Sequence, residues 1–146
     1  MRVLGLDVGD KTIGVAISDE MRWTAQAFEV IQRKGLSRDI ERIKEILSEY
    51  QVKEIIIGLP KNMNGEEGPQ AKKVREFLKK LQAQVDLPIK TWDERLTTTA
   101  AERTLLEGDL SRAKRKKIID KVAAQVILQG YLDSIGTHSL VSPVDK

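Results

Sequence analysis

Short apolar runs, separated by turns, occupy the first part of the chain. They cover residues 3–8, 12–18 and 24–32, and glycine and aspartate residues lie between them. Short runs of this kind, joined by tight turns, are typical of adjacent antiparallel strands. The pattern therefore predicts a three-stranded antiparallel meander.

The spacing of the apolar positions changes after Gly35. From Leu36 to Tyr50 they recur every three or four residues, which predicts an amphipathic helix with Ser37 as its N-cap. Further strands are predicted at 54–60 and within 87–94, and further helices at about 69–84, 97–107 and 111–134. Strand–helix–strand connections favour parallel neighbours, so we expect a mixed sheet with helices on both faces.

No linker, repeat or low-complexity segment interrupts these elements. We therefore expect one α/β domain over residues 1–138 of the 146-residue chain, followed by a flexible tail at 139–146. The sequence contains no run that is long and apolar enough to span a membrane, and no signal-peptide pattern. We accordingly expect a cytoplasmic protein with no membrane partner.

The composition limits the metal chemistry that is available. The chain has no cysteine and a single histidine, His138. Disulfides, thiolate metal sites and histidine-rich zinc sites are therefore excluded. A bound metal must be held mainly by carboxylates, which favours Mg²⁺ or Mn²⁺.

Acidic residues occupy two unusual positions in the predicted strands. Asp7 lies inside an apolar strand, where an uncompensated carboxylate loses favourable hydration. Asp93 and Glu94 end the fifth strand, at the carboxyl edge where ligands gather in open α/β sheets. These two residues point to opposite faces of a strand, so alternation alone does not decide which of them belongs to a site.

A third acid, Asp120, lies in the last predicted helix. It shares a helical stripe with Ala123, Ala124, Ile127 and Tyr131. The small residues of this stripe let the helix approach the sheet closely, so Asp120 is expected to face Asp7. The alternative is an ion pair with Lys116 or Lys117, one turn earlier. Like charges at short range require a proton or a cation between them.

The three acids together suggest a site for two divalent ions. Two such ions activate a water molecule and stabilise the leaving oxygen in phosphodiester hydrolysis. Basic residues directly precede Asp120, at Arg112, Lys114, Arg115, Lys116 and Lys117. A basic rim beside an acidic centre suits a nucleic-acid backbone, whereas the alternative for this run, and for a second basic run at 72–80, is a solvated helix face.

Four segments of the chain stand out together: LGLDVGDKTIGVAISD, IIIGLPKNMNG, WDERLTT and KKIIDKVAAQVILQGYL. In this order they resemble the YqgF/RuvX family of Holliday junction resolvases and pre-16S rRNA nucleases. The resemblance implies a ribonuclease H-like fold, with a five-stranded sheet of order 3-2-1-4-5 and an antiparallel strand 2. It also implies a catalytic, metal-binding triad of Asp7, Glu94 and Asp120, with Mg²⁺ or Mn²⁺ as cofactor and structured RNA or branched DNA as partner.

Six further residues near this triad are candidates for nucleic-acid contacts. They are Lys11, Thr12, Asn62, Asn64, Arg95 and Thr97. The alternative for Lys11 and Thr12 is that they only form the turn of the hairpin. Arg95 either clamps a phosphate with two hydrogen bonds or fixes Glu94 in place.

The resemblance implies a metal-dependent endonuclease or exonuclease that processes the 5′ end of pre-16S rRNA in ribosome biogenesis and also resolves Holliday junctions. Two alternatives remain open. One is a non-catalytic adaptor that binds nucleic acid or the ribosome. The other is an ATP-binding module, because DVGDKTIGVA also resembles the phosphate hairpin of actin and the sugar kinases. The sequence does not choose between RNA and DNA or between Mg²⁺ and Mn²⁺, and we expect a monomer or weak homodimer.

Overall fold

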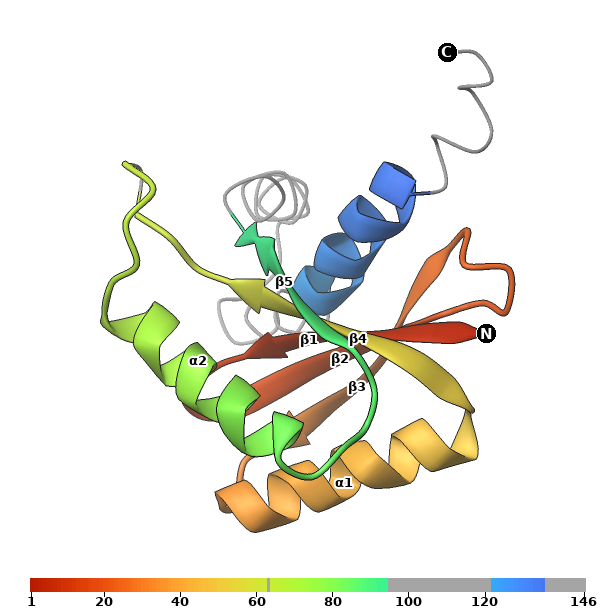
Figure 1. Cartoon of the computed structure of the whole chain (residues 1–146), viewed down its shortest axis with the longest axis horizontal. Coiled ribbons are helices and arrows are strands. Elements are labelled where there is room, and N and C mark those ends of the chain that lie inside the picture. The colour runs from red at the N-terminus through yellow and green to blue at the C-terminus, as the bar shows by residue number, and fades with distance from the viewer. Residues whose placement is uncertain (63, 95–121, 136–146) are drawn as a thin grey trace, which may run out of the picture.

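A computed structural model describes residues 1–62, 64–94 and 122–135 (Figure 1). The labelled elements are β1 (Arg2–Val8), β2 (Thr12–Ser18), β3 (Ala25–Gln32), α1 (Leu36–Glu49), β4 (Val52–Leu59), α2 (Pro69–Gln82) and β5 (Ile89–Asp93). Residues 122–135 form a further helix, the C-terminal helix. The predicted helix at 97–107, the start of the one at 111–134 and the tail at 139–146 lie outside the described residues.

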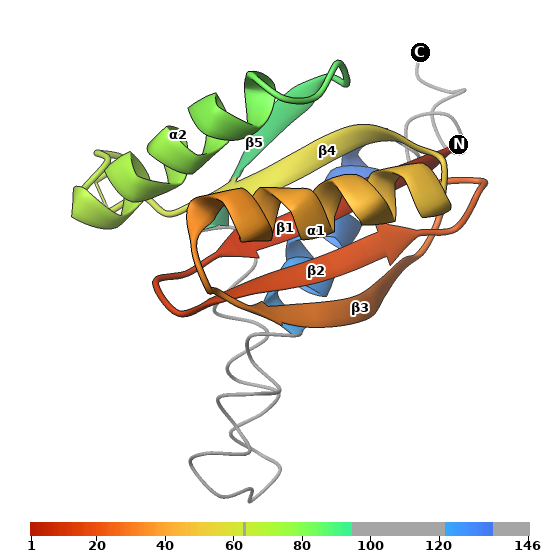
Figure 2. The ribbon, with the colours of Figure 1, turned by 90° about the horizontal axis from the view of Figure 1, so that it is seen from below.

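The five strands form one mixed sheet of order β3-β2-β1-β4-β5. β2 is antiparallel to both β1 and β3, whereas β4 is parallel to β1 and β5. Figure 2 shows how the hairpins keep the first three strands adjacent, while α1 and α2 carry the chain across to β4 and β5. The predicted topology, with strand 2 antiparallel, is therefore confirmed.

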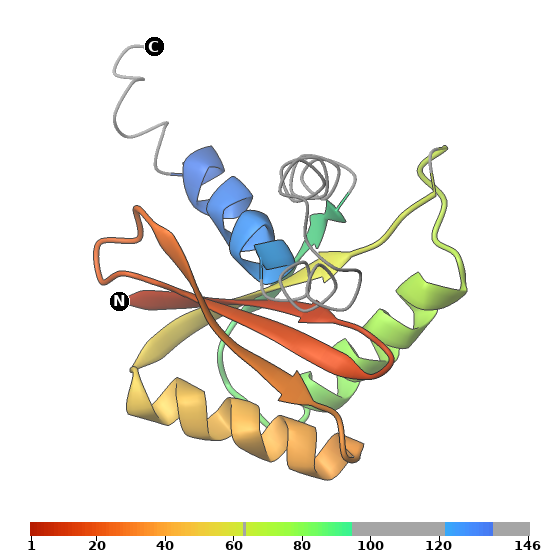
Figure 3. The same cartoon turned by 180° about the vertical axis from the view of Figure 1, so that it is seen from behind.

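The sheet separates two apolar clusters, because successive strand residues point to opposite faces. In β1, Leu4 and Leu6 join the cluster beneath α1 and α2. Val3 belongs to the other cluster, which the C-terminal helix covers through Ala124 and Leu128. Figure 3 shows this helix on the face opposite α1 and α2, so the expected cover of both faces is confirmed.

The start of α1 differs from the expected capping. The N-cap residue is Gly35, with φ of 136°, and no side chain caps the helix, so the prediction for Ser37 was wrong. The Asp39 carboxylate instead accepts a hydrogen bond of 3.2 Å from the backbone N–H of Lys34. Asp39 lies in the first turn of the helix, where a negative charge is favourable. The acid therefore fixes the chain that leads into the helix, and it does not replace the missing side-chain cap.

The C-terminal helix approaches the sheet closely at β1. A Cβ atom on Gly5 would lie 2.8 Å from the Cβ of Leu128 and 3.3 Å from the carbonyl oxygen of Ala124. Only a residue without a side chain fits there, which explains a glycine inside a buried strand. None of the helices in the described part of the chain is long and apolar enough to cross a bilayer.

Candidate functional site

Asp7 lies near the carboxyl end of β1, on the face that the C-terminal helix covers. It shares that face with Val3 and Gly5, because strand residues two apart point the same way. Asp7 is partly buried, between the buried residues Leu6 and Val8. The carboxylate therefore belongs to a buried central strand and lies near the carboxyl ends of the parallel strands.

Glu94 directly follows β5 and lies over Gly58 of β4. An added Cβ on Gly58 would come within 2.9 Å of Glu94 Oε2. The β1–β4 register pairs Leu6 with Ile57, and its continuation by one residue places Asp7 beside Gly58. The two carboxylates, 87 positions apart in sequence, are thus placed on the same end of the sheet, Glu94 over Gly58 and Asp7 on the neighbouring strand beside it.

The packing of β5 separates Glu94 from its neighbour Asp93. Trp92 joins the cluster beneath the C-terminal helix, and its ring lies 6.3 Å from that of Tyr131, nearly perpendicular at 82°. Ile89 packs on the other face. Alternation then places Glu94 on the face of Asp7 and Asp93 on the opposite face, paired in register with Leu59. The structure thus decides which of the two neighbouring acids shares a face with Asp7, and it is Glu94.

The C-terminal helix runs antiparallel to β4. Tyr131 donates a hydrogen bond of 2.9 Å to Glu54 near the start of β4, and Ile127 lies over Gly58 near its end. The N-terminal end of the helix is therefore directed at the edge that carries Asp7 and Glu94. Ala124 and Ile127 face the sheet, with exposed fractions of 0% and 1%. The expected inward stripe is confirmed over its described residues, whereas Asp120 itself lies outside them.

The turn between β1 and β2 is held in place by the cationic side chain of Arg33. The backbone N–H of Gly9 donates to the carbonyl of Thr12 at 2.8 Å, which closes the turn. Arg33 Nη1 donates to the carbonyl of Gly9 at 2.8 Å, and Arg33 Nε pairs with Asp39 at 3.0 Å. The Lys11 side chain is exposed and Thr12 is partly buried. The turn therefore presents Lys11 beside the strand that carries Asp7.

The loop between β4 and α2 contains the two predicted amides. Asn64 Nδ2 donates to Glu66 Oε1 at 2.7 Å, and its Oδ1 accepts from the Glu66 backbone N–H at 3.0 Å. The carbonyl of Asn62 accepts a hydrogen bond from the backbone N–H of Gly65 at 2.8 Å. Both asparagines are exposed. They thus combine turn contacts with side chains that solvent can reach.

The remaining predicted contacts are outside the described residues. They are Arg95, Thr97, Arg112, Lys114, Arg115, Lys116 and Lys117. Across the described residues, no group of three or more histidine, cysteine, aspartate or glutamate side chains is placed to hold a metal ion. The proposed third ligand, Asp120, is not among those residues. The two described acids supply oxygen donors, which suit a hard divalent cation.

Two residues that shape this site were not among the predicted ones. Gly58 leaves room for Glu94, and Gly5 leaves room for the helix. A signal for both was present in the sequence. An isolated glycine inside a strand pattern marks a close approach by another part of the chain.

The fold matches those of known DNA junction resolvases. RuvC of T. thermophilus, solved in complex with a Holliday junction substrate, superposes with a TM-score of 0.61 at 18% identity, covering 94% of this chain and 97% of RuvC. The fowlpox virus Holliday junction resolvase gives a TM-score of 0.54 at 14% identity, covering 92% and 100%. The fold is therefore the ribonuclease H-like fold of RuvC-type resolvases.

Sequence comparison gives the family. The model of the RuvX family, described as Holliday junction resolvase, matches residues 1–134. A "Putative pre-16S rRNA nuclease" of Desulforamulus reducens is 61% identical over 134 residues, covering 92% of this chain and 98% of its own. The protein of the same description from Moorella thermoacetica is 56% identical over 140 residues, covering 96% and 100%. This chain belongs to the RuvX family.

Proposed function

We propose that this protein is a divalent-metal-dependent nuclease that hydrolyses phosphodiester bonds in structured RNA. One observation carries the proposal. Glu94 lies over Gly58, and the β1–β4 register places the partly buried Asp7 on the strand beside that glycine, in a chain of the RuvX family. Asp120 is the proposed third member, since the C-terminal helix is directed at this edge and Asp120 precedes Ala124 by four residues in the sequence.

The donor set fits Mg²⁺ or Mn²⁺, which Asp7, Glu94 and Asp120 would hold through oxygen atoms. When bound, such ions supply activation of a water molecule and stabilisation of the leaving oxygen. Asp7 is fixed by the buried strand around it, and Glu94 is confined by the contacts over Gly58. The exposed Lys11 is positioned to attract a phosphate. The chain therefore brings orientation and charge to the reacting bond.

The substrate proposal comes from the relatives. Proteins about 60% identical to this one carry the description "Putative pre-16S rRNA nuclease", which points to that precursor, and we propose its 5′ end as the site of cleavage. Branched DNA is the competing substrate, because the family model is described as Holliday junction resolvase. The predicted rim at Arg112–Lys117, Asn62, Asn64, Arg95 and Thr97 would contact the backbone of either substrate. We propose a monomer or weak homodimer.

The decisive experiment is a cleavage assay on single-stranded RNA, structured pre-rRNA 5′ ends, RNA–DNA hybrid and four-way DNA junctions. Each substrate is tested with Mg²⁺, Mn²⁺ or EDTA, using wild type, Asp7→Asn, Glu94→Gln and Asp120→Asn. We expect metal-dependent cutting of structured RNA, reduced by at least about a hundredfold in each variant. Cutting of junctions in preference to RNA would reassign the substrate.

Neighbouring acids provide matched controls, because each loses the same charge within a few residues of its partner. Asp10→Asn controls for Asp7 and removes only an exposed pair with Lys73 at 3.1 Å. Asp93→Asn controls for Glu94, from the opposite face of the strand. Activity lost equally in Glu94→Gln and Asp93→Asn would contradict the proposed site. If no protein cuts any substrate, a non-catalytic adaptor becomes the better explanation.

A further inference from the structure

A cavity of about 400 Å³ lies at the amino ends of β1 and β4, which is the end of the sheet opposite to that of Asp7 and Glu94. It is lined by residues at the start of β1, β4 and β5, by the turn between β2 and β3, and by the C-terminal helix. Fold precedent places ligands at the carboxyl ends of parallel strands, so nothing about the fold predicts a site here. What the cavity can bind therefore depends on the charge and shape of its lining residues.

Positive charge dominates the lining of this cavity. Four cationic side chains and one carboxylate contribute to it: Arg2, Arg22, Lys53, Lys90 and Glu54. Glu54 already forms an ion pair with Lys90 at 2.9 Å and accepts a hydrogen bond from Tyr131 at 2.9 Å. Within the described residues, no carboxylate pairs with Arg22 or Lys53. Two exposed cations therefore face an opening whose one acid is already occupied.

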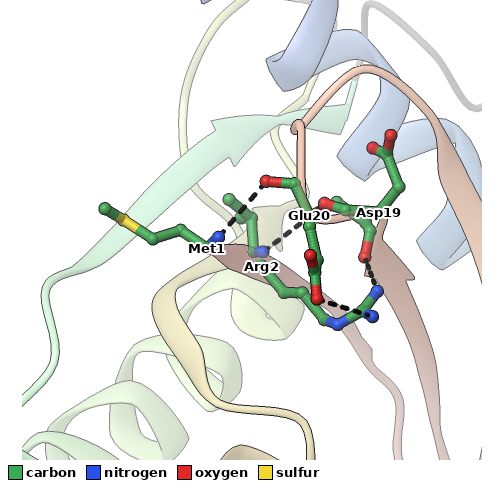
Figure 4. A network of polar contacts seen from close by, with 6 residues as sticks. Met1, Arg2, Asp19 and Glu20 are labelled. Carbon is green, nitrogen blue, oxygen red and sulfur yellow. Dashed lines mark hydrogen bonds and ion pairs between the residues drawn. The ribbon is translucent and has the colours of Figure 1, made fainter.

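A network of polar contacts fixes the wall of the cavity (Figure 4). Arg2 Nη1 donates to the carbonyl of Ser18 at 3.0 Å, and its Nη2 lies 3.7 Å from Glu20 Oε1. The Met1 nitrogen donates to the carbonyl of Glu20 at 3.2 Å. Arg2 is thus engaged in holding the turn between β2 and β3. Arg22 and Lys53 are left as the cations that can meet a ligand.

The turn that carries Arg22 also carries an exposed aromatic side chain. Asp19 Oδ1 accepts from the backbone N–H groups of Trp23 at 2.8 Å and Thr24 at 3.1 Å, which fixes the turn. Arg22 has φ of 62°, a left-handed conformation that a residue with a side chain rarely adopts. The Trp23 side chain is 57% exposed. The turn therefore holds an indole in solvent although exposure of an indole is unfavourable.

The exposed apolar side chains gather at the same edge. In the described part of the chain, the large apolar residues that are exposed are Met1, Met21 and Trp23. Met1 lines the cavity, while Met21 and Trp23 flank Arg22. Exposed apolar side chains close to exposed cations are typical of an interaction surface.

We propose that this cavity and Trp23 form a second nucleic-acid contact, which takes phosphates of a single strand and stacks one base on the exposed indole. A cationic groove with an aromatic platform is the combination by which proteins bind single strands without reading their sequence. An acidic peptide would use the cations but would leave the indole without a planar partner. The inference rests on the proposed function in so far as that function supplies a nucleic-acid substrate.

The contact would hold a strand that extends beyond the reacting bond. The parallel strands of the sheet span roughly 25 Å between the two edges, at about 3.3 Å a residue. A single strand of several nucleotides covers such a distance. Long substrates should therefore bind more tightly than those confined to the acidic edge.

The test measures binding of a 20-nucleotide RNA and of a dinucleotide in EDTA, where cleavage is prevented. The variants are Arg22→Glu/Lys53→Glu and Trp23→Ala. We expect each variant to weaken binding of the long RNA by about tenfold, and the double variant to reduce the salt slope by about 1.4, for two phosphate contacts. Quenching of tryptophan fluorescence by the long RNA should disappear in Trp23→Ala.

The matched control is Arg38→Glu/Lys44→Glu, which makes the same charge change at two exposed positions of α1. It should keep wild-type affinity and quenching. Equal weakening by the two double variants would overturn the inference, because bulk charge would then explain both. Unquenched Trp23 in the saturated wild-type complex, or quenching by an acidic peptide as strong as by RNA, would also overturn it.

Failure of this inference is distinguishable from failure of the proposed nuclease function. The proposed nuclease function predicts loss of cutting in Asp7→Asn with full binding of the long RNA. The second contact predicts weaker binding in Arg22→Glu/Lys53→Glu while a short substrate is still cut at the wild-type rate. A melting curve for each variant shows that it is folded.

Discussion

Asp39 shows how one buried charge can organise the turn beside the candidate site. Its side chain is 1% exposed, and it pairs with Arg33, which in turn holds the carbonyl of Gly9. Arg33 also lies over the ring of Phe77, 5.6 Å from its centre. A buried charge is tolerated only when paired and hydrogen-bonded, so these contacts form one unit.

We expect Asp39→Ala to lower the free energy of unfolding by about 3 kcal/mol, because it breaks a buried pair and removes the acceptor for the Lys34 N–H. Urea denaturation measures the loss. Glu67→Gln is the control, since it breaks an exposed pair with Arg75 and should cost much less. A loss no larger than that of the control would show that Asp39 does not hold the turn.

Asp7 makes a prediction that does not depend on the substrate. If Asp7 and Glu94 hold a divalent ion, Mg²⁺ or Mn²⁺ should raise the melting temperature of the wild type, because a ligand that binds only the folded state stabilises it. Asp7→Asn should abolish most of this rise, whereas Asp10→Asn should keep it. Differential scanning fluorimetry across a metal titration measures both. An equal rise in all three proteins would indicate ion binding elsewhere.

The C-terminal helix and β4 depend on each other through Gly58. A Cβ at this position would lie 2.5 Å from Ile127 Cδ1 and 2.9 Å from Glu94 Oε2. The glycine therefore sets both the depth of the helix and the position of an acid. A change at Gly58 would therefore alter both the packing of the C-terminal helix and the position of Glu94.

Gly58→Ala should cost about 1–3 kcal/mol of stability and should also reduce cleavage, because it displaces Ile127 and Glu94 together. Ile127→Val removes the Cδ1 atom, so the double variant should be more stable than the sum of the two single losses predicts. Cleavage should stay low in the double variant, since the crowding against Glu94 remains. Denaturation and a cleavage assay on the same preparations separate the two effects.

Glu54, Lys90 and Tyr131 connect β4, β5 and the C-terminal helix into one unit. Lys90 Nζ lies 3.3 Å from the Tyr131 hydroxyl and 2.9 Å from Glu54 Oε2. Burial and the hydrogen bond to Glu54 raise the pKa of Tyr131 above its ordinary value of 10.0. Hydrogen bonds to Glu54 and Tyr131 raise the pKa of Lys90 above 10.5. Both groups thus bind their protons more tightly in the folded chain.

Stability should therefore be full below about pH 10 and should fall as the pH rises through the two raised pKa values, since the unfolded chain releases these protons first. Urea denaturation between about pH 8 and about pH 11 measures this fall. Tyr131→Phe removes the contribution of the phenol, so its stability should decline less steeply. An identical slope in that variant would mean that Tyr131 does not contribute.

Much of the architecture could be predicted because it depends on local patterns. The alternation in β1 and the helical spacing in α1 reflect which face of each element is buried, and the connections restrict the topology. The role of Asp39 at the start of α1 could not be predicted, because it depends on Arg33 and on the Gly9 carbonyl, which lies far away in sequence. The candidate acids Asp7 and Glu94 stood out as charges within a strand and at the end of one.

The sequence by itself determined the order of the elements, the mixed sheet and the family, since apolar periodicity and motif residues are local properties of the chain. Only the tertiary structure decided that Glu94, rather than Asp93, shares a face with Asp7, because that depends on which side of β5 packs against the C-terminal helix. It also assembled Arg22, Lys53 and Lys90 around one cavity. Residues far apart in the sequence meet only where the sheet aligns its strand ends, and no local pattern encodes that alignment.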